Sequence, residues 1–449
     1  MRKFKAHFCH MVEEKITRPY LVLKEYIRFL VNKIYYKKAY VADSGNVPPE
    51  GTPMLIVSDH QNSLMDALGI LLSINDRKVH FIARADVFNI HPLATRFLYW
   101  IGLLPAFRLA FEGEEGLSNN DETFRVSEQN LLDGRTVVIY PEAGHQDKHW
   151  LGRFSYGYTR MAFQAAELGN FETDIVILPA CNHYSEYCAL RSQGYTRYGT
   201  PIHLQPFYEL YKEKPRTAQR EVNALVREQI KNMMLNVEDV GNYRAIDYLR
   251  ESVPGRDAAR KAGLDPDNLE QKLQSDKDFV RRLDEAALPY DDVNSLLDGM
   301  EKLEVRDEDF DRKPSMTEIV LRCVCLLLFL PAAFLAAWPS LLCWIIPEYF
   351  TRKVGDKMLR ASFLVALNVL FILPICGLIT LIATWIRKNF LSAIIYASLL
   401  PFICCFEWYY WKLLKSTVSV IKYYRAEKAG QIAPLKELRR KVHSVFSQI

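Results

Sequence analysis

The chain has 449 residues, 57 of them Lys or Arg and 53 Asp or Glu, and 49% of it is hydrophobic. This length suffices for two or three domains, and the near-balanced net charge of +4 argues against a dedicated nucleic-acid-binding protein. With 20 Gly, 21 Pro and 12% aromatic residues, the composition excludes a collagen-like or globally disordered chain.

Residues 1–45 are predicted to form an amphipathic helix on a membrane surface. Met1–Tyr40 carries ten Lys or Arg, three Glu and no Asp, and apolar side chains recur at helical spacing between Leu21 and Tyr35. This pattern suits a helix on an anionic membrane and equally a surface helix packed on its own domain. The segment lacks the apolar core and cleavage site of a signal peptide.

Residues 46–235 alternate between short apolar runs and helical patterns, which predicts an α/β domain with a mostly parallel sheet flanked by helices. Several runs are apolar throughout, as in strands buried on both faces. The predicted strands are Met54–Ser58, Val79–Ala83, Thr136–Tyr140, Asp174–Pro179 and Ile202–Phe207. The predicted helices are Ser63–Leu72, His91–Ile101, Val126–Asp133, Tyr156–Leu168 and Arg216–Met234.

Sites in such sheets lie where strands end, and His60 directly follows the first predicted strand. Asp66 comes six residues later, on or beside the next helix. His80 and Asp86 repeat this spacing, but His80 lies inside an apolar strand and is interpreted as structural. The His60–Asp66 spacing therefore needs further support.

That support comes from the order of four sequence blocks, which resembles the glycerophospholipid acyltransferase family. The family shows N-H-x4-D, G-x5-R, F-P-E-G and a hydrophobic strand ending in Pro. The counterparts here are His60 and Asp66; Gly102 and Arg108; Tyr140-Pro141-Glu142 with Gly144; and Val176–Pro179. The resemblance covers roughly residues 35–235. The family includes glycerol-3-phosphate and lysophosphatidic acid acyltransferases.

Three positions depart from the family pattern. Asp59 replaces the usual Asn, five residues instead of four separate His60 from Asp66, and Ala143 stands where Gly is usual. The longer spacing resembles a branch that includes yeast-type dual glycerol-3-phosphate and dihydroxyacetone-phosphate acyltransferases and tends to carry C-terminal membrane segments. The two side chains can meet across a strand-to-helix turn but not within one regular helix.

The resemblance implies His60 as the general base and Asp66 as the residue that orients it. It also implies Arg108, Glu142, Gly144, Gly102 and Pro141 as the substrate-binding set, with Arg108 gripping a phosphate. Glu142 is alternatively a structural carboxylate bonded to backbone amides. The secondary candidates for phosphate binding are Arg84, Lys148 and Arg191. For each of them, a solvated surface cation is the more common interpretation.

His145 and His149, four residues apart with Asp147 between them, could form a metal-ligand pair on one helix face, but this is the weaker interpretation because Gly144 and the polar run suggest a loop and no third ligand is evident. No metal and no cofactor are therefore expected; acyl-CoA or acyl-ACP would be the co-substrate. The nine Cys show neither a disulfide framework nor a zinc pair.

The C-terminal half is predicted to be helical and membrane-associated. Residues 236–316 are interpreted as a helical linker or cap, 317–412 as transmembrane or re-entrant segments, and 413–449 as a basic cytoplasmic tail. The apolar runs are Ile319–Ile346, which contains Arg322, and the uncharged Ala361–Ile386 and Phe390–Phe406.

Three functions follow as hypotheses. The first is a membrane-bound acyltransferase acting on glycerol 3-phosphate or lysophosphatidic acid, its domain facing the cytoplasm from a bacterial inner membrane or the endoplasmic reticulum. The others are a non-catalytic lipid-binding protein on the same fold and a thioesterase-type hydrolase. The expected partners are a lipid membrane, an acyl thioester donor and a phosphorylated glycerol acceptor, with no nucleic acid.

Overall fold

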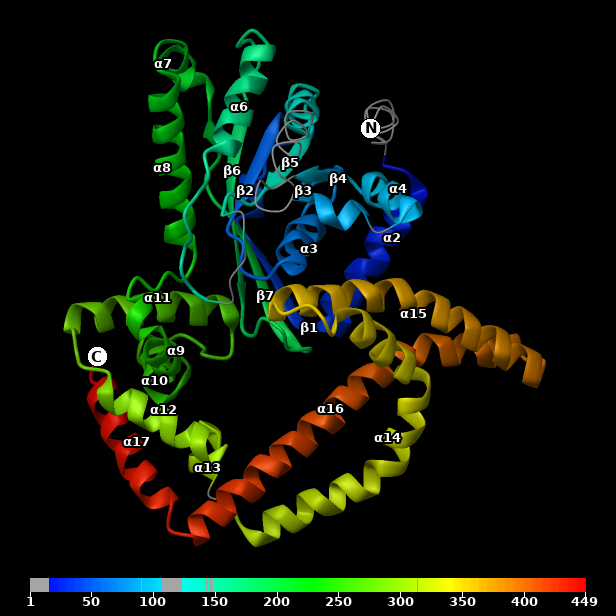
Figure 1. Ribbon diagram of the computed structural model, residues 1–449, viewed down its shortest axis with the longest axis vertical. Helices are drawn as coiled ribbons and strands as arrows, with labels where there is room; N and C mark the ends of the chain where they lie inside the picture. Colours follow the sequence, from blue (N-terminus) through cyan, green and yellow to red (C-terminus); the bar gives the residue numbers. More distant parts are fainter. Residues whose placement is uncertain (1–15, 90, 107–122, 143, 145–147, 313) are drawn as a thin grey trace. The chain divides into compact units, whose positions relative to one another are not determined.

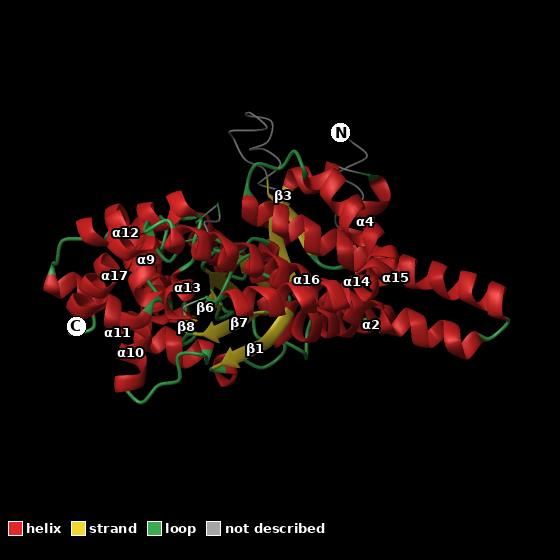
Figure 2. Cartoon of the chain, turned by 90° about the horizontal axis from the view of Figure 1, so that it is seen from below, coloured by secondary structure: helices red, strands yellow, loops and turns green. Residues whose placement is uncertain are grey.

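The computed structural model describes residues 16–89, 91–106, 123–142, 144, 148–312 and 314–449. The chain divides into two compact units, Met1–Leu235 and Asn236–Ile449. All strands of the described residues belong to the first unit, and the second is helical (Figures 1 and 2).

An eight-stranded sheet forms the centre of the first unit, in the order β1-β7-β6-β2-β5-β3-β4, with β8 beside β6. All neighbouring strands are parallel except the β6–β7 and β6–β8 pairs. The strands are β1 (Tyr36–Ala42), β2 (Met54–Ser58), β3 (Val79–Arg84), β4 (Leu103–Ala106), β5 (Thr136–Ile139), β6 (Val176–Tyr184), β7 (Ser192–Tyr198) and β8 (Ile202–His203).

Helices cover both faces of this sheet, which explains why its central strands are apolar throughout. In β2, Leu55 and Val57 belong to the core beneath α6 and α8, whereas Met54 and Ile56 belong to the core beneath α3. Figure 1 shows α6 and α8 on one side of the strands and α3 on the other. The helices are α2 (Arg18–Phe29), α3 (Leu64–Ser73), α4 (Pro92–Trp100), α6 (Gly157–Leu168), α7 (Tyr208–Glu213) and α8 (Pro215–Met233), with a further helix at 123–132.

The predicted α/β architecture is confirmed, and each predicted strand and helix of residues 46–235 has a counterpart. Three strands were not predicted: β1, β4 and β7. Strand β6 continues past Pro179 to Tyr184, so the expectation of a strand ending in Pro is wrong. Its later residues include Asn182 and His183, which are polar yet buried, and so lack the apolar signal of a strand.

The N-terminal segment is not one continuous helix. Helix α2 ends at Phe29, a π-helical turn spans Leu30–Tyr35, and β1 follows. On α2, the Lys24 Nζ donates to the Ile74 carbonyl and the Tyr20 ring contacts Trp100 edge-on. The described part of this segment thus packs on its own domain.

The second unit combines a helical bundle with three long apolar helices. Its members are α9 (Tyr243–Glu251), α10 (Val253–Lys261), α11 (Leu269–Ala286), α12 (Asp291–Leu303), α13 (Asp307–Arg312), α14 (Met316–Thr351), α15 (Lys357–Arg387), α16 (Phe390–Lys428) and α17 (Ile432–Phe446). Residues 413–449, expected as a basic tail, form the end of α16 and then α17. On α17, Phe446 stacks on Tyr290 and Arg439 pairs with Asp307. Buried apolar side chains and this ion pair therefore join the tail to the predicted linker.

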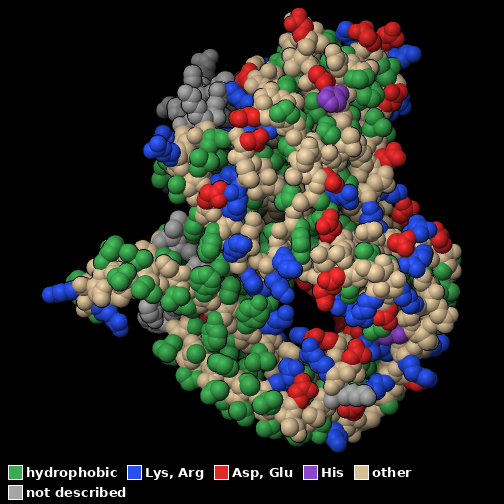
Figure 3. Space-filling view, turned by 180° about the vertical axis from the view of Figure 1, so that it is seen from behind, with side chains coloured by type: hydrophobic (Ala, Val, Ile, Leu, Met, Phe, Trp, Pro, Cys, Tyr) green, Lys and Arg blue, Asp and Glu red, His purple; other side chains and the backbone are tan. Residues whose placement is uncertain are grey.

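Within the part of the chain that the structure describes, two helical segments are long and apolar enough to cross a membrane, Met316–Ala337 and Lys357–Arg387. Their side chains are mostly exposed, and Figure 3 shows hydrophobic surface gathered over this region. The third apolar run, 390–406, forms the first half of α16, where it precedes a polar second half. Arg322 pairs with Glu318 on α14 and donates to Ser416 on α16. These observations weakly suggest membrane association.

Candidate active site

His60 and Asp66 meet at the carboxyl edge of the sheet. β2 ends at Ser58, and α3 begins at Leu64 with Asp66 in its first turn. Ser63, at the start of α3, has a positive φ of 47°, so the chain turns sharply before the helix. This turn brings the His60 Nδ1 to 2.9 Å from the Asp66 Oδ2. The five-residue spacing is thus compatible with a direct contact.

Four donors surround the Asp66 carboxylate, which is fully buried. The backbone amides of Gln61 and Asn62 donate to the Asp66 Oδ2 at 2.9 and 2.8 Å, beside His60. The Tyr184 hydroxyl donates to the Asp66 Oδ1 at 2.7 Å. His60 keeps 18% of its side chain exposed, so the imidazole lies between a buried carboxyl group and the surface.

Glu142 connects the two loops of the site through backbone amides. Its Oε1 accepts from the His60 N–H at 2.9 Å, and its Oε2 accepts from the Gly152 N–H at 2.8 Å. Burial raises the pKa of the Glu142 carboxyl, while these two hydrogen bonds lower it. Both carboxylate oxygens of Glu142 therefore accept hydrogen bonds from backbone amides. This is the arrangement expected if Glu142 has a structural role and does not bind substrate.

Aromatic side chains complete the surroundings of the imidazole. The rings of His60 and Tyr140 stack with centroids 4.2 Å apart and planes 21° from parallel. The Tyr187 hydroxyl donates to the Gln61 Oε1 at 2.9 Å and lies 3.0 Å from the His149 Nδ1. The turn that carries His60 is thus held from both β5 and the segment after β6.

Asp59 is a second buried carboxyl next to the histidine. Its Oδ1 accepts from the Asn182 backbone amide at 2.9 Å and from the Ser58 hydroxyl at 3.2 Å. Burial, and then the charge of Asp66, raise the pKa of the Asp59 carboxyl well above its ordinary value. A neutral Asp59 would resemble the Asn that it replaces.

The remaining candidates of the family blocks lie in different places. Pro141 is buried after β5, and Gly144 is exposed. Gly102 precedes β4, so it lies at the amino edge of the sheet, opposite His60. With φ of +95°, its added Cβ would lie 2.8 Å from the Val79 carbonyl oxygen, which explains a glycine there. Arg108 and Ala143 lie outside the described residues.

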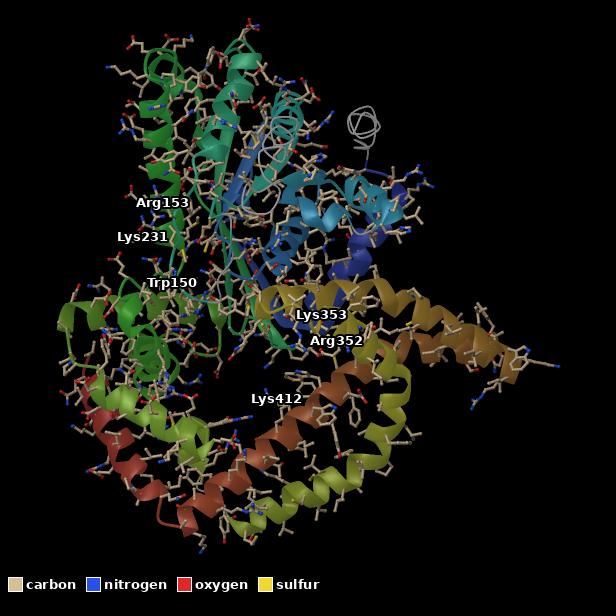
Figure 4. The ribbon with its side chains drawn as sticks, in the orientation of Figure 1. Trp150, Arg153, Lys231, Arg352, Lys353 and Lys412 are labelled. Atoms are coloured by element: carbon tan, nitrogen blue, oxygen red, sulfur yellow. The ribbon has the colours of Figure 1, made fainter. Side chains whose placement is uncertain are left out.

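The secondary cations are also dispersed. Arg84 ends β3 and therefore lies at the same sheet edge as His60. The Lys148 Nζ lies 4.9 Å from the Trp150 ring centroid, on the segment that also carries Arg153 (Figure 4). Arg191 donates to the Lys33 carbonyl at 2.7 Å, so its guanidinium holds backbone.

The metal interpretation gains no support from the described side chains. Among the residues that the structure describes, no three His, Cys, Asp or Glu form a group able to hold a metal. His145 and Asp147 lie outside those residues, and His149 is buried beside Tyr187.

Comparison with known proteins assigns the domain that carries this site. Residues 38–183 match the family model described as Acyltransferase. This segment is an acyltransferase-family domain. A solved structure of the 1-acyl-sn-glycerophosphate (LPA) acyltransferase PlsC from Thermotoga maritima is similar at 17% identity and a TM-score of 0.33, over 46% of this chain and 79% of that one. No curated protein matches the chain.

Several residues of this acyltransferase domain's site were not predicted. Tyr184 contacts Asp66 from 118 positions away and lies beyond the predicted end of its strand. The stacking of Tyr140 on His60 and the amide of Gly152 likewise depend on long-range geometry. The sequence offered one signal for these contacts, the aromatic residue Tyr140 at the first position of the third block.

Proposed function

We propose that this chain is a membrane-bound O-acyltransferase. It moves a fatty acyl group from an acyl thioester, acyl-CoA or acyl-ACP, to a hydroxyl of glycerol 3-phosphate or lysophosphatidic acid. The observation that carries the proposal is the contact between His60 and the buried, multiply hydrogen-bonded Asp66.

His60 would act as the general base. With the Nδ1 held by Asp66, the Nε2 takes the proton from the acceptor hydroxyl as its oxygen attacks the thioester carbonyl carbon. Asp66 stabilises the resulting imidazolium. When the tetrahedral intermediate collapses, the C–S bond breaks, and the imidazolium returns the proton to the departing thiolate. The acyl group ends on the acceptor oxygen, and the histidine is regenerated.

The acceptor phosphate would be bound by cationic side chains. Arg108 remains the first candidate on the strength of the sequence block. Among described residues, Arg84 at the end of β3 is placed at the carboxyl edge of the sheet, whereas Arg191 holds backbone carbonyls. The apolar helices α14 and α15 would anchor the protein in the bilayer that supplies and receives the lipid.

An assay of the full-length protein in lipid nanodiscs tests the proposal. A labelled acyl-CoA or acyl-ACP is offered with glycerol 3-phosphate, dihydroxyacetone phosphate, lysophosphatidic acid or a lysophospholipid. His60→Ala should lower acyl transfer roughly 10²–10⁴-fold, the usual contribution of a positioned base, while membrane association remains.

The chain offers a matched control in His203, whose Nδ1 also contacts an aspartate, Asp174, at 2.6 Å but whose side chain is 61% exposed. His203→Ala should leave activity unchanged. Full activity in His60→Ala would overturn the mechanism. Label appearing only as free fatty acid would instead indicate a hydrolase, and thioester binding without turnover a non-catalytic lipid-binding protein.

A further inference from the structure

A side chain outside the proposed acid–base pair makes a close contact with the reacting imidazole. β2 and β5 are parallel neighbours, with Val57 paired to Ile139. Residues just beyond these strands therefore emerge side by side, which places Tyr140 against His60. Their rings stack at 4.2 Å with planes 21° apart, a geometry in which the phenol face covers the imidazole face.

We infer that Tyr140 is a positioning residue whose ring face stabilises the imidazolium form of His60; this inference rests on the proposed role of His60 as a base. A cation held over an aromatic face is attracted by the negative potential of the ring. The attraction arises only when His60 takes the proton, so it favours the protonated intermediate over the resting site. Asp66 acts at the edge of the same imidazole, through Nδ1, and Tyr140 acts at its face.

The Tyr140 ring, and not its hydroxyl, is the part that serves this role. The hydroxyl is buried and has no hydrogen-bond partner among the described residues. Burial raises the Tyr140 pKa well above its ordinary value, so the phenol stays neutral. The ring itself packs against the core between the sheet and α3, which fixes its plane relative to His60.

Other titratable groups surround the imidazole and must stay constant in any test. Asp66 on α3 contacts the His60 Nδ1, and Glu142 after β5 interacts with His60. Asp59, which follows β2, and Tyr184 on β6 both interact with Asp66. Substitution of Tyr140 leaves all of these carboxyl and hydroxyl groups in place. A change in the pH dependence of His60 chemistry can then be attributed to the ring face.

The first experiment measures the pH profile of kcat/KM for the full-length protein and two variants. Tyr140→Phe keeps the ring and removes the orphan hydroxyl, so it should retain the wild-type profile with an equal or higher Tm. Tyr140→Leu removes the ring; its kcat should fall about tenfold and the acidic limb of its profile should move to lower pH by about 0.5 unit. Equal pH profiles in both variants would overturn the inference.

A second measurement separates this inference from the proposed function. Diethyl pyrocarbonate modifies neutral imidazole, and peptide mass spectrometry follows modification of His60 against pH without any acyl transfer. The midpoint should move to lower pH in Tyr140→Leu and stay in place in Tyr140→Phe, even if the protein proves inactive with every acceptor. An unmoved midpoint in Tyr140→Leu argues against the ring's role whatever the catalytic result.

Because Tyr140→Leu also changes packing, a shape-matched series completes the test. Phenylalanines carrying increasing fluorine at position 140 keep the ring in place while reducing the negative potential of its face. A graded movement of the modification midpoint with fluorination supports the inference. A midpoint that does not respond to fluorination in folded protein overturns it.

Discussion

Among the residues that the structure describes, the first unit holds two His–Asp pairs, which differ in their surroundings. His60 meets Asp66 at 2.9 Å, and His203 meets Asp174 at 2.6 Å. Asp66 is fully buried and His60 18% exposed, whereas Asp174 and His203 are 29% and 61% exposed. A surface pair of this kind contributes little. The surroundings of the pair, and not the pair alone, therefore define the candidate site.

The edges of the sheet add to this contrast. His60 follows the carboxyl end of β2, where parallel strands present their loops. His203 lies on β8, which pairs with Val176 at the amino end of β6. The first pair has two backbone amides, an aromatic stack and a tyrosine hydroxyl converging on it. In the second pair, Asp174 accepts from one backbone amide, that of Gln205.

The largest expected effect comes from neutralising the buried partner. Asp66→Asn can still accept from the His60 Nδ1–H through its amide oxygen, but it lacks the charge that stabilises the imidazolium. Acyl transfer should fall about 10²–10⁴-fold, measured as kcat/KM in the nanodisc assay. Asp174→Asn is the matched control and should keep full activity. Equal activities of the two variants would remove the distinction between the pairs.

A smaller effect, on stability, should follow from a substitution that disturbs the clamp, the two hydrogen bonds by which the Glu142 carboxylate joins the backbone amides of His60 and Gly152. A Cβ on Gly152 would lie 2.3 Å from the Glu142 Oε2, so Gly152→Ala forces that carboxylate away from the amides it holds. Loss of these partly buried hydrogen bonds to a carboxylate should cost about 1–3 kcal/mol, observed as a lower Tm. Gly144→Ala is the control, because a Cβ there meets nothing within 4 Å. A Gly152→Ala variant with wild-type Tm would show that the clamp is dispensable.

The sequence predicted those parts of the domain that have a local or ordered signal. Central strands such as β2 were predicted from their continuous apolar runs. The order of the four sequence blocks identified His60 and Asp66. Edge strand β1 includes the exposed Lys37 and Lys38, and β4 includes a Pro, so neither has the composition of a strand. No local pattern could reveal them.

Contacts between distant residues set the same limit for the site. Tyr184 meets Asp66 only because β6 continues beyond Pro179, where it pairs with β7. The meeting of His60 with Asp66 depends on the backbone turn at Ser63, whose positive φ is unusual for a non-glycine residue. Gly102 matches the glycine of the family's second block. The structure nevertheless explains a glycine at this position by the turn into β4. Motif order thus located His60 and Asp66, while the fold added the contacts of Tyr140 and Tyr184.

The smallest expected effect concerns Asp59, the buried carboxyl with no counterpart near His203. Burial and the charge of Asp66 raise its pKa in the folded protein, so the folded state keeps a proton that the unfolded chain releases above about pH 4. The stability associated with this proton is complete below the unfolded pKa and is lost as pH rises toward the folded pKa. Asp59→Asn cannot titrate, and its amide oxygen can still accept from the Asn182 N–H. The variant should therefore match wild type at about pH 4 or below and exceed its Tm by about 2–4 °C at pH 8. Thermal unfolding of both proteins at the two pH values measures this difference, and a Tm difference that is the same at both would show that Asp59 does not hold an extra proton beside His60.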